Sequence, residues 1–286
     1  MKNQAGHYVE GKSGGVGAMD GDDRLASRAS ARLRAAGCVF AEDEARLLIS
    51  EARTAAELET MVDLRATGLP LEQVVGWAEF CGLRIAVDRG VFVPRPRTEL
   101  LVRHAVELAL IPARGLSGPR ILVDLCCGSG AVGAALVAAL DAVELHAADV
   151  DPAAVRCARR NLAATGARVY AGDLFDALPA RLHGRVELLV ANVPYVPTEA
   201  IELLPQEARV HEPRLALDGG PDGLDVQRRV AAAAPQWLAS GGRLLFETSR
   251  AQAPLAADTL TRHGMTARVT SSDELDTAVV AGTLAA

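Results

Sequence analysis

The chain has 286 residues, enough for one large or two modest domains at about 150 residues per domain. Half of the residues are hydrophobic, so a sizeable core is available and wholesale disorder is not expected. With 30 basic against 36 acidic residues, the net charge of −6 argues against bulk electrostatic binding to nucleic acid or to an anionic membrane.

The cysteines and the apolar runs indicate the compartment. The five cysteines form no Cys-x-x-Cys pair and have no histidine at zinc spacing, which predicts reduced thiols and no metal site. The sequence has no run of about 18 apolar residues and no signal peptide at its start. We therefore expect a soluble, cytoplasmic protein that makes no stable contact with a membrane or with nucleic acid.

The first part of the chain is predicted to be helical. Residues 1–22 hold glycine-rich pieces with almost no periodic apolar pattern, which predicts a mobile arm. From Asp23 onward the apolar residues recur at about four-residue spacing, as in helices. The third helical stretch opens with Thr54 to Glu57, a capping box in which each side chain satisfies the other residue's backbone donor. We place a small helical domain at residues 23–86 and a larger domain at residues 87–286.

A β-hairpin is predicted to link the two domains. Between Glu79 and Val93 the apolar period drops to two around a turn at Asp88 to Gly90. From Arg120 onward, strand-like runs alternate with helical stretches, which predicts an α/β domain with a mostly parallel, doubly wound sheet. The last two runs, 266–269 and 278–280, are joined by a link too short for a parallel crossover, so we expect them to pair antiparallel.

The first motif that carries chemistry runs from Val123 to Gly130. Glycines at such a strand-to-helix junction let a ligand approach the backbone, and the free amides of the helix favour an electron-rich group. Asp149 ends the next strand about 20 residues later, the spacing at which a carboxylate meets ribose hydroxyls. Asp173 follows the third strand and could reach an adenine, whereas Asp151 precedes a proline and is predicted to cap a helix.

These features favour a nucleoside cofactor. The absence of a third glycine and of a phosphate-binding Lys-Ser/Thr argues against a dinucleotide or a nucleoside triphosphate.

The second motif is Asn192, Val193, Pro194 and Tyr195, directly after the fourth apolar strand. Enzymes that methylate a planar nitrogen beside a π system use this arrangement, because the delocalised lone pair makes such a nitrogen a poor nucleophile. The Asn192 side-chain oxygen and the carbonyl of the next residue can accept hydrogen bonds from the NH₂ group, while the Tyr195 ring stacks on the planar group. Glu247, after the fifth strand, either faces the pocket or caps a turn.

Together with three further segments, these motifs resemble the protein N5-glutamine methyltransferases that modify peptide chain release factors. The segments are Leu69 to Gly76, Val93 to Glu99, and Glu212 to Leu224. The resemblance implies a seven-stranded, Rossmann-like class I methyltransferase fold that uses S-adenosylmethionine. It also implies a helical substrate-docking domain and a release factor as partner, with a Gly-Gly-Gln glutamine as methyl acceptor.

The resemblance also implies a role for each residue. Cys126 to Gly130 hold the methionine part of the cofactor, Asp149 takes the ribose hydroxyls, and Asp173 and Leu174 border the adenine. The cofactor-binding set is Asp124, Cys126, Cys127, Gly128, Ser129, Gly130, Asp149, Asp173, Leu174 and Asn192. The catalytic set is Asn192, Val193, Pro194 and Tyr195, and the substrate-binding set adds Glu212 to these four.

Three departures from the family pattern carry their own expectations. Val193 stands where the family has proline, so we expect function to survive in a less rigid loop. Cys126 and Cys127 replace Gly-Thr, and the added Cys126 side chain is expected to weaken or retune cofactor binding. Arg97 replaces an acidic residue and is expected to alter the opening through which the substrate enters the site.

Three other functions use the same motifs. A nucleic-acid methyltransferase would act on the adenine or guanine amino group of a flipped base, although the acidic charge counts against it. A small-molecule N-methyltransferase is the second, and an inactive methyltransferase-like binding protein, given the departures at Cys126 and Val193, is the third. No oligomeric state follows from these motifs.

Overall fold

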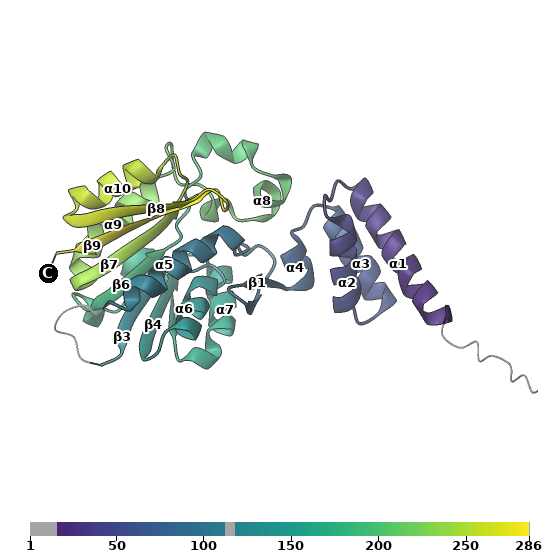
Figure 1. Cartoon of the computed structure of the whole chain (residues 1–286), viewed down its shortest axis with the longest axis horizontal. Helices are drawn as coiled ribbons and strands as arrows, with labels where there is room; N and C mark the ends of the chain where they lie inside the picture. Colours follow the sequence, from purple (N-terminus) through teal and green to yellow (C-terminus); the bar gives the residue numbers. More distant parts are fainter. Residues whose placement is uncertain (1–15, 112–117, 286) are drawn as a thin grey trace, which may run out of the picture. The chain divides into compact units, whose positions relative to one another are not determined.

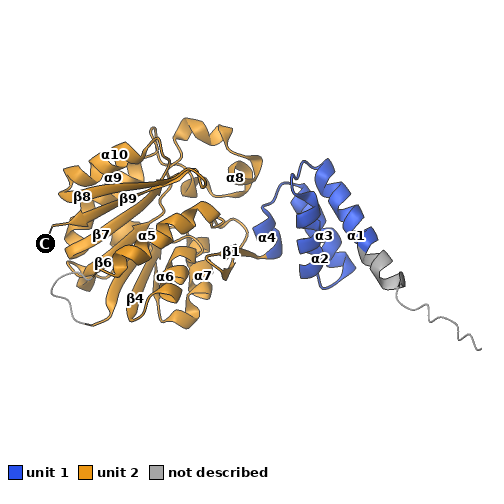
Figure 2. Ribbon diagram, in the orientation of Figure 1, with its two compact units in different colours: residues 1–75 blue, residues 76–286 orange. Residues whose placement is uncertain are grey.

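The computed structural model describes residues 16–111 and 118–285, with side chains described from residue 23. The chain divides into two compact units, residues 1–75 and 76–286 (Figure 2). The boundary expected near residue 86 therefore lies inside unit 2, because the hairpin before it is hydrogen-bonded into that unit.

The described part of unit 1 is a bundle of four helices: α1 (Val16–Ala35), α2 (Ala41–Glu51), α3 (Ala55–Ala66) and α4 (Leu71–Val75) (Figure 1). Helix α1 begins at Val16, so residues 16–22 belong to a helix instead of the expected arm. The rest of that arm, residues 1–15, lies outside the described residues.

Packing and capping explain these helices. Their apolar faces meet in a core of Ala29, Leu33, Ala41, Ala45, Leu48, Leu58, Met61 and Val62. The Thr54 hydroxyl accepts the Glu57 amide at 3.1 Å, as the capping box predicts. The Glu57 carboxylate instead accepts the amide of Arg53 at 2.9 Å, so only half of the expected box forms. A buried ion pair, Arg65 to Glu44 at 2.7 Å, joins α3 to α2.

Unit 2 is built on a seven-stranded sheet with the order β5-β4-β3-β6-β7-β9-β8. Strands β5 to β7 in this order pair in parallel, whereas β9 pairs antiparallel with both β7 and β8. This confirms the mostly parallel sheet and its antiparallel tail. The strands are β3 (Arg120–Leu125), β4 (Val143–Asp149), β5 (Arg168–Ala171), β6 (Val186–Ala191), β7 (Leu238–Thr248), β8 (Met265–Ser272) and β9 (Thr277–Leu284).

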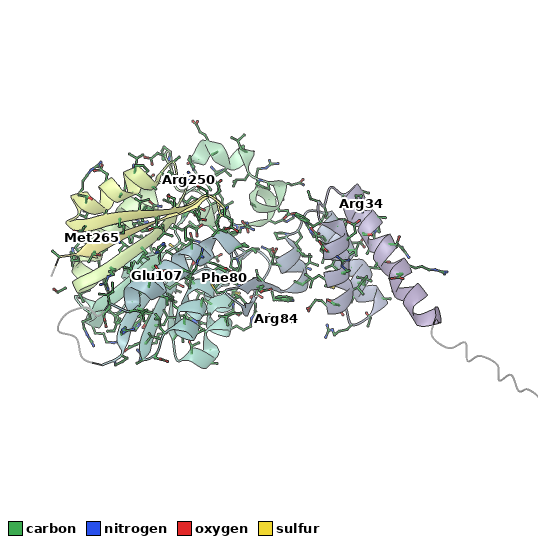
Figure 3. All side chains as sticks on the ribbon, viewed as in Figure 1. Arg34, Phe80, Arg84, Glu107, Arg250 and Met265 are labelled. Carbon is green, nitrogen blue, oxygen red and sulfur yellow. The ribbon has the colours of Figure 1, made fainter. Side chains whose placement is uncertain are left out.

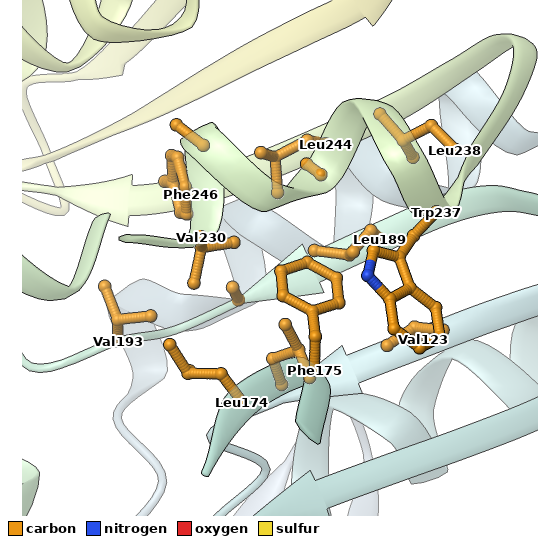
Figure 4. Close-up of a cluster of buried hydrophobic side chains, with 14 of the residues drawn as sticks. Val123, Leu174, Phe175, Leu189, Val193, Val230, Trp237, Leu238, Leu244 and Phe246 are labelled. Carbon is orange, nitrogen blue, oxygen red and sulfur yellow. The ribbon is translucent and has the colours of Figure 1, made fainter. Parts of the chain in front are cut away.

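Helices cover both faces of this sheet. Neighbouring strand residues point to opposite faces, so Leu188 packs toward α5, α6 and α7, and Leu189 toward α9 and α10. On the face covered by α9 and α10, the rings of Phe175 and Trp237 stack with their centroids 5.3 Å apart (Figure 4). The helices are α5 (Glu99–Ala109), α6 (Ala131–Ala139), α7 (Pro152–Asn161), α8 (Gln206–His211), α9 (Asp225–Trp237) and α10 (Ala253–Arg262).

Short 3₁₀ helices occupy several of the connections: η1 (Pro96–Thr98), η2 (Ala163–Thr165), η3 (Leu174–Ala177), η4 (Ala180–Leu182), η5 (Thr198–Leu203) and η6 (Arg214–Ala216). No helix among the described residues is long and apolar enough to cross a lipid bilayer.

The linking hairpin is shorter than expected. It consists of β1 (Trp77–Phe80) and β2 (Leu83–Ala86), and its turn is Cys81 and Gly82. Both turn residues have positive φ, +49° and +73°, as the two-residue turns that match strand twist require. A turn does form at Asp88 to Gly90, where the Val91 amide donates to the Asp88 carbonyl at 3.1 Å, but it follows β2 and does not join the two strands of the hairpin. Phe80 is fully buried, whereas Arg84 lies on the exposed side (Figure 3).

The Asn161 side chain is one of those that join the hairpin to the rest of unit 2. The Asn161 amide donates to the carbonyls of Ala86 and Ser129, at 2.8 Å each, and its oxygen accepts the Ala86 amide at 2.9 Å. Asn161 thereby ties the end of β2 to the loop before α6.

We expect Asn161→Ala to lower the free energy of unfolding by about 1–3 kcal/mol, because the Ala86 amide and the Ser129 carbonyl lose their hydrogen-bond partner. Urea denaturation measures the effect. Gln206→Ala, at an exposed position, is the control and should change little. Equal stability of the two variants would contradict the role of Asn161.

Candidate active site at the carboxyl ends of the parallel strands

A pocket of about 1300 Å³, counting its opening to solvent, lies at the carboxyl ends of β3, β4 and β6. Open α/β sheets bind their ligands at this edge. The lining includes twelve of the sequence-predicted residues: Asp124, Cys126, Cys127, Gly128, Ser129, Asp149, Asp173, Leu174, Asn192, Val193, Pro194 and Tyr195. The fold thus gathers four separate stretches of sequence around one space.

Two predicted residues, Gly130 and Glu212, lie outside the lining. Gly130 is the N-cap of α6 with φ +79°, and a Cβ there would meet Ala158 at 3.2 Å, so it serves close helix packing. The fully buried Glu212 side chain accepts the Val93 amide at 3.2 Å and the Arg95 guanidinium at 2.6 Å. Glu212 therefore positions the 93–95 loop instead of contacting a substrate directly.

Asp149 is oriented by two backbone amides. Its carboxylate accepts the Gly128 amide at 2.8 Å on one oxygen and the Asp151 amide at 2.9 Å on the other. Burial raises the pKa of Asp149 above its ordinary value, against the opposing effect of these amides. A carboxylate oxygen has two lone pairs, so each oxygen of this pocket-lining residue can accept a further hydrogen bond from a hydroxyl. Asp151 caps α7 through the Ala153 amide at 2.8 Å, as predicted.

The two cysteines of the loop are neutral packing residues. Cys126 has φ +55°, a left-handed conformation that costs a residue with a Cβ about 1–2 kcal/mol. Burial raises the pKa of both Cys126 and Cys127 well above the usual thiol value, so neither is a thiolate at neutral pH. None of the five cysteines forms a disulfide within the described part of the chain.

Asp173 lies at the outer end of the pocket. Its carboxylate forms a 2.6 Å ion pair with Arg229 of α9, which also lines the pocket. The next residue, Leu174, has φ +48° and is buried. Sequence reasoning missed Arg229, since nothing in a helix sequence shows which strand end it will face.

Asn192 is held in one orientation by Thr98. The Asn192 side-chain nitrogen donates to the Thr98 hydroxyl at 3.4 Å, and Thr98 is almost completely buried. Within the described residues, the Asn192 side-chain oxygen has no hydrogen-bond partner, and the Val193 carbonyl has none either. These two oxygens are therefore available as hydrogen-bond acceptors on neighbouring residues. Thr98 belongs to a segment that the sequence singled out, but its pairing was not predicted.

Tyr195 is anchored from behind the pocket. Its hydroxyl donates to Glu247 of β7 at 3.1 Å, and Arg97 donates to the same carboxylate oxygen at 3.3 Å. Burial and the charge of Glu247 raise the pKa of the phenol, so it stays protonated. The Tyr195 carbonyl accepts from Gln252 at 2.9 Å. Glu247 thus acts through Tyr195 and Arg97, whereas the sequence left open a pocket-facing or turn-capping role.

Comparison with known proteins identifies the family of the chain. The family model "Methyltransferase small domain" matches residues 98–218. A release factor glutamine methyltransferase of Mycolicibacterium smegmatis is 39% identical over 222 residues, which is 77% of this chain and 76% of the relative. The chain belongs to this family.

Two further likenesses are informative. A 4-amino-L-phenylalanine/4-methylamino-L-phenylalanine methyltransferase of Streptomyces pristinaespiralis is 41% identical over 184 residues, 64% of this chain and 62% of that protein. The crystal structure of a methyltransferase from Pyrococcus furiosus has a TM-score of 0.54 at 14% identity, covering 78% of this chain and 98% of that one. The structural likeness confirms the class I methyltransferase fold.

Methyltransferases of this family use S-adenosylmethionine, and the residues of the pocket fit it. Asp149 has free lone pairs for a ribose, and a Cβ built on Gly128 would meet nothing within 4 Å, so the loop leaves open space for a ligand. Asp124, beneath the loop, is buried and accepts the Gly133 amide at 2.9 Å. Burial raises the pKa of Asp124 to about 7, and the charge of Asp149 adds to this.

The raised pKa of Asp124 predicts a pH dependence of stability. The folded-state pKa of about 7 exceeds the ordinary value of 3.8, so between these values the folded protein binds more protons than the unfolded chain. Stability contributed by the protonated form is therefore lost as pH rises toward 7. We expect Asp124→Asn, which stays neutral and keeps an oxygen for Gly133, to gain on the wild type by on the order of 2 kcal/mol between about pH 5 and pH 8.

Urea denaturation of both proteins across this pH range measures the difference. Burial is the main cause that lowers the pKa of His146, so its effect on the pH dependence of stability has the opposite sign. Both proteins keep His146, so this effect cancels in the difference between them. A difference that does not change with pH would contradict the assignment.

Proposed function

We propose that this methyltransferase transfers the methyl group of S-adenosylmethionine to the side-chain amide nitrogen of a glutamine, in the Gly-Gly-Gln segment of a peptide chain release factor. The observation that carries the proposal is the orientation of Asn192. Thr98 takes its NH₂ group, so its oxygen is left to accept a hydrogen bond from the acceptor nitrogen. The membership of the chain in the release factor glutamine methyltransferase family supports the same acceptor.

The pocket orients the glutamine amide so that its nitrogen can attack the methyl group. The Asn192 oxygen and the Val193 carbonyl each accept one hydrogen of the acceptor NH₂ group, which fixes the plane of the amide. The Tyr195 ring stacks on that plane and fixes the position of the nitrogen. When bound, S-adenosylmethionine would supply the methyl group from its sulfonium, leaving as the neutral thioether, and the amide nitrogen would release its surplus proton to solvent.

Positioning carries the rate enhancement, because no residue at the acceptor is a strong base. The Tyr195 phenol stays protonated, and the Glu247 carboxylate is buried behind it. Good orientation alone can supply about 7–11 kcal/mol of a barrier. The side chain of Val193 is buried in the core beside Leu174 (Figure 4), and Gln252 donates to the Tyr195 carbonyl two residues further on. Core packing thus limits the loss of rigidity expected without the family's proline.

A small-molecule aromatic amine is a second candidate acceptor. The relative from Streptomyces pristinaespiralis that is 41% identical to this chain is named for methylating 4-amino-L-phenylalanine. An arylamine nitrogen is planar and has a delocalised lone pair, as an amide nitrogen does, so it meets the same acceptors. The net charge of −6 favours either acceptor over a nucleic acid. We place the reaction in the cytoplasm, a reducing compartment that suits the five cysteines.

Mass spectrometry of a release factor incubated with the enzyme and S-adenosylmethionine tests the proposal. We expect a mass increase of one CH₂ on the Gly-Gly-Gln peptide. Asn192→Ala should abolish it, while calorimetry shows cofactor affinity within about tenfold of wild type, because the nucleoside contacts are elsewhere. An active Asn192→Ala enzyme would contradict the role of Asn192, and an unmodified glutamine would contradict the acceptor.

Thr98→Val separates orientation from binding. Valine keeps the shape of threonine but cannot accept the hydrogen bond from the Asn192 side chain. We expect kcat to fall about tenfold with KM nearly unchanged. The acceptor amide would still bind, but Asn192 would no longer fix it in the orientation that the transition state requires. Steady-state kinetics with the release factor measures both constants. A change confined to KM would show that Thr98 has another role.

A further inference from the structure

The strand order arranges the chemistry of the pocket along one line. The carboxyl ends run β5, β4, β3, β6, β7, and these strands are followed or ended by Asp173, Asp149, Cys126, Asn192 and Glu247 respectively. The nucleoside-binding carboxylates lie over β5 and β4, and the amide-binding Asn192 lies over β6. The end of β7 is therefore on the side of the methyl acceptor, away from the nucleoside.

Arg97 occupies that acceptor end. It lines the pocket, and its Nε donates to the Glu247 oxygen that also accepts the Tyr195 hydroxyl. The guanidinium and the phenol therefore lie side by side. The Glu247 side chain is only 1% exposed, whereas that of Arg97 is 44% exposed. Glu247 thus holds Arg97 from behind and leaves its outer part accessible from the pocket.

The outer part of Arg97 has unused donors. Its Nε donates to Glu247 and the guanidinium also hydrogen-bonds the Tyr195 hydroxyl, so among the described residues most of its five N–H donors have no acceptor. A guanidinium stays charged at all physiological pH values, and its planar fork matches the two oxygens of a carboxylate. The neighbouring lining residues Phe92 and Pro94 are apolar, so they offer the guanidinium no competing acceptor through their side chains.

We propose that Arg97 selects a methyl acceptor that carries a carboxylate on the far side of its reactive nitrogen. The proposal rests on the proposed function for the transfer itself and adds the acceptor's charge. The carboxylate can come from an acidic residue next to the glutamine of a protein, or from the α-carboxyl group of a free aromatic amino acid. With an acidic residue at position 97, as in the family pattern, the pocket would repel the same group.

Two matched pairs of acceptors test the charge. The peptides are Gly-Gly-Gln-Glu and Gly-Gly-Gln-Gln with blocked ends, and the small molecules are 4-amino-L-phenylalanine and its carboxamide. In at least one pair we expect the wild-type enzyme to favour the carboxylate by about tenfold or more in kcat/KM, mainly through KM. Arg97→Gln should remove this preference, and Arg97→Glu should reverse it.

Two controls separate this effect from general damage. Arg268→Gln, at an exposed position on β8, should keep the wild-type preference. Calorimetry should give the same S-adenosylmethionine affinity for wild type and Arg97→Gln. A loss of cofactor affinity with an unchanged acceptor preference would assign the guanidinium to the cofactor and overturn the proposal.

The outcomes for the two proposals differ. If wild type methylates both members of each pair equally, Arg97 does not read a carboxylate, and glutamine methylation still stands. If neither peptide is methylated but the amino acid is preferred over its carboxamide, the glutamine acceptor falls and the role of Arg97 stands. The wild-type comparison needs no variant, so a misfolded Arg97→Gln protein would not rescue the proposal.

Discussion

The parallel pairing of five adjacent strands is the constraint on which this pocket depends. Parallel strands present their carboxyl ends at one edge, so residues that follow different strands meet there without being close in sequence. For this reason alone, Asp149 and Asn192 line the same pocket. The antiparallel pair β9 and β8 adds strands beyond β7 and completes the sheet outside the pocket.

Buried and half-buried polar side chains hold the loops that the sheet leaves irregular. Glu212 holds the 93–95 loop, Gln252 holds the loop after Asn192, and Asn161 holds the end of the hairpin. Each of these side chains bonds to backbone groups that have no partner in a strand or helix. Because an unpaired buried backbone group is costly, such bonds fix loop positions as firmly as strand pairing does. Orientation of an acceptor amide requires loops of this kind.

The sequence predicts the strand ends better than it predicts what pairs with them. Asp149 and Asn192 could be identified because each follows an apolar run directly. The bonds of Thr98 to Asn192 and of Glu247 to Tyr195 join segments far apart in the chain, so only the folded structure reveals them. The hairpin turn was misplaced because Cys81 is an unusual turn residue, whereas Asp88 to Gly90 carry typical turn residues.

The three departures from the family pattern act on three different physical properties. Cys126 keeps the left-handed backbone that glycine adopts easily, so it adds conformational strain without closing the pocket. Val193 replaces ring rigidity with core packing, and valine has the same backbone carbonyl as proline, the group that we propose binds the acceptor. Arg97 alone changes a charge, and its side chain is 44% exposed at the pocket. Strain and packing affect how well a site is formed, whereas charge affects which ligand it admits. Under the role that we propose for Arg97, the choice of acceptor therefore depends on this residue more than on the other two.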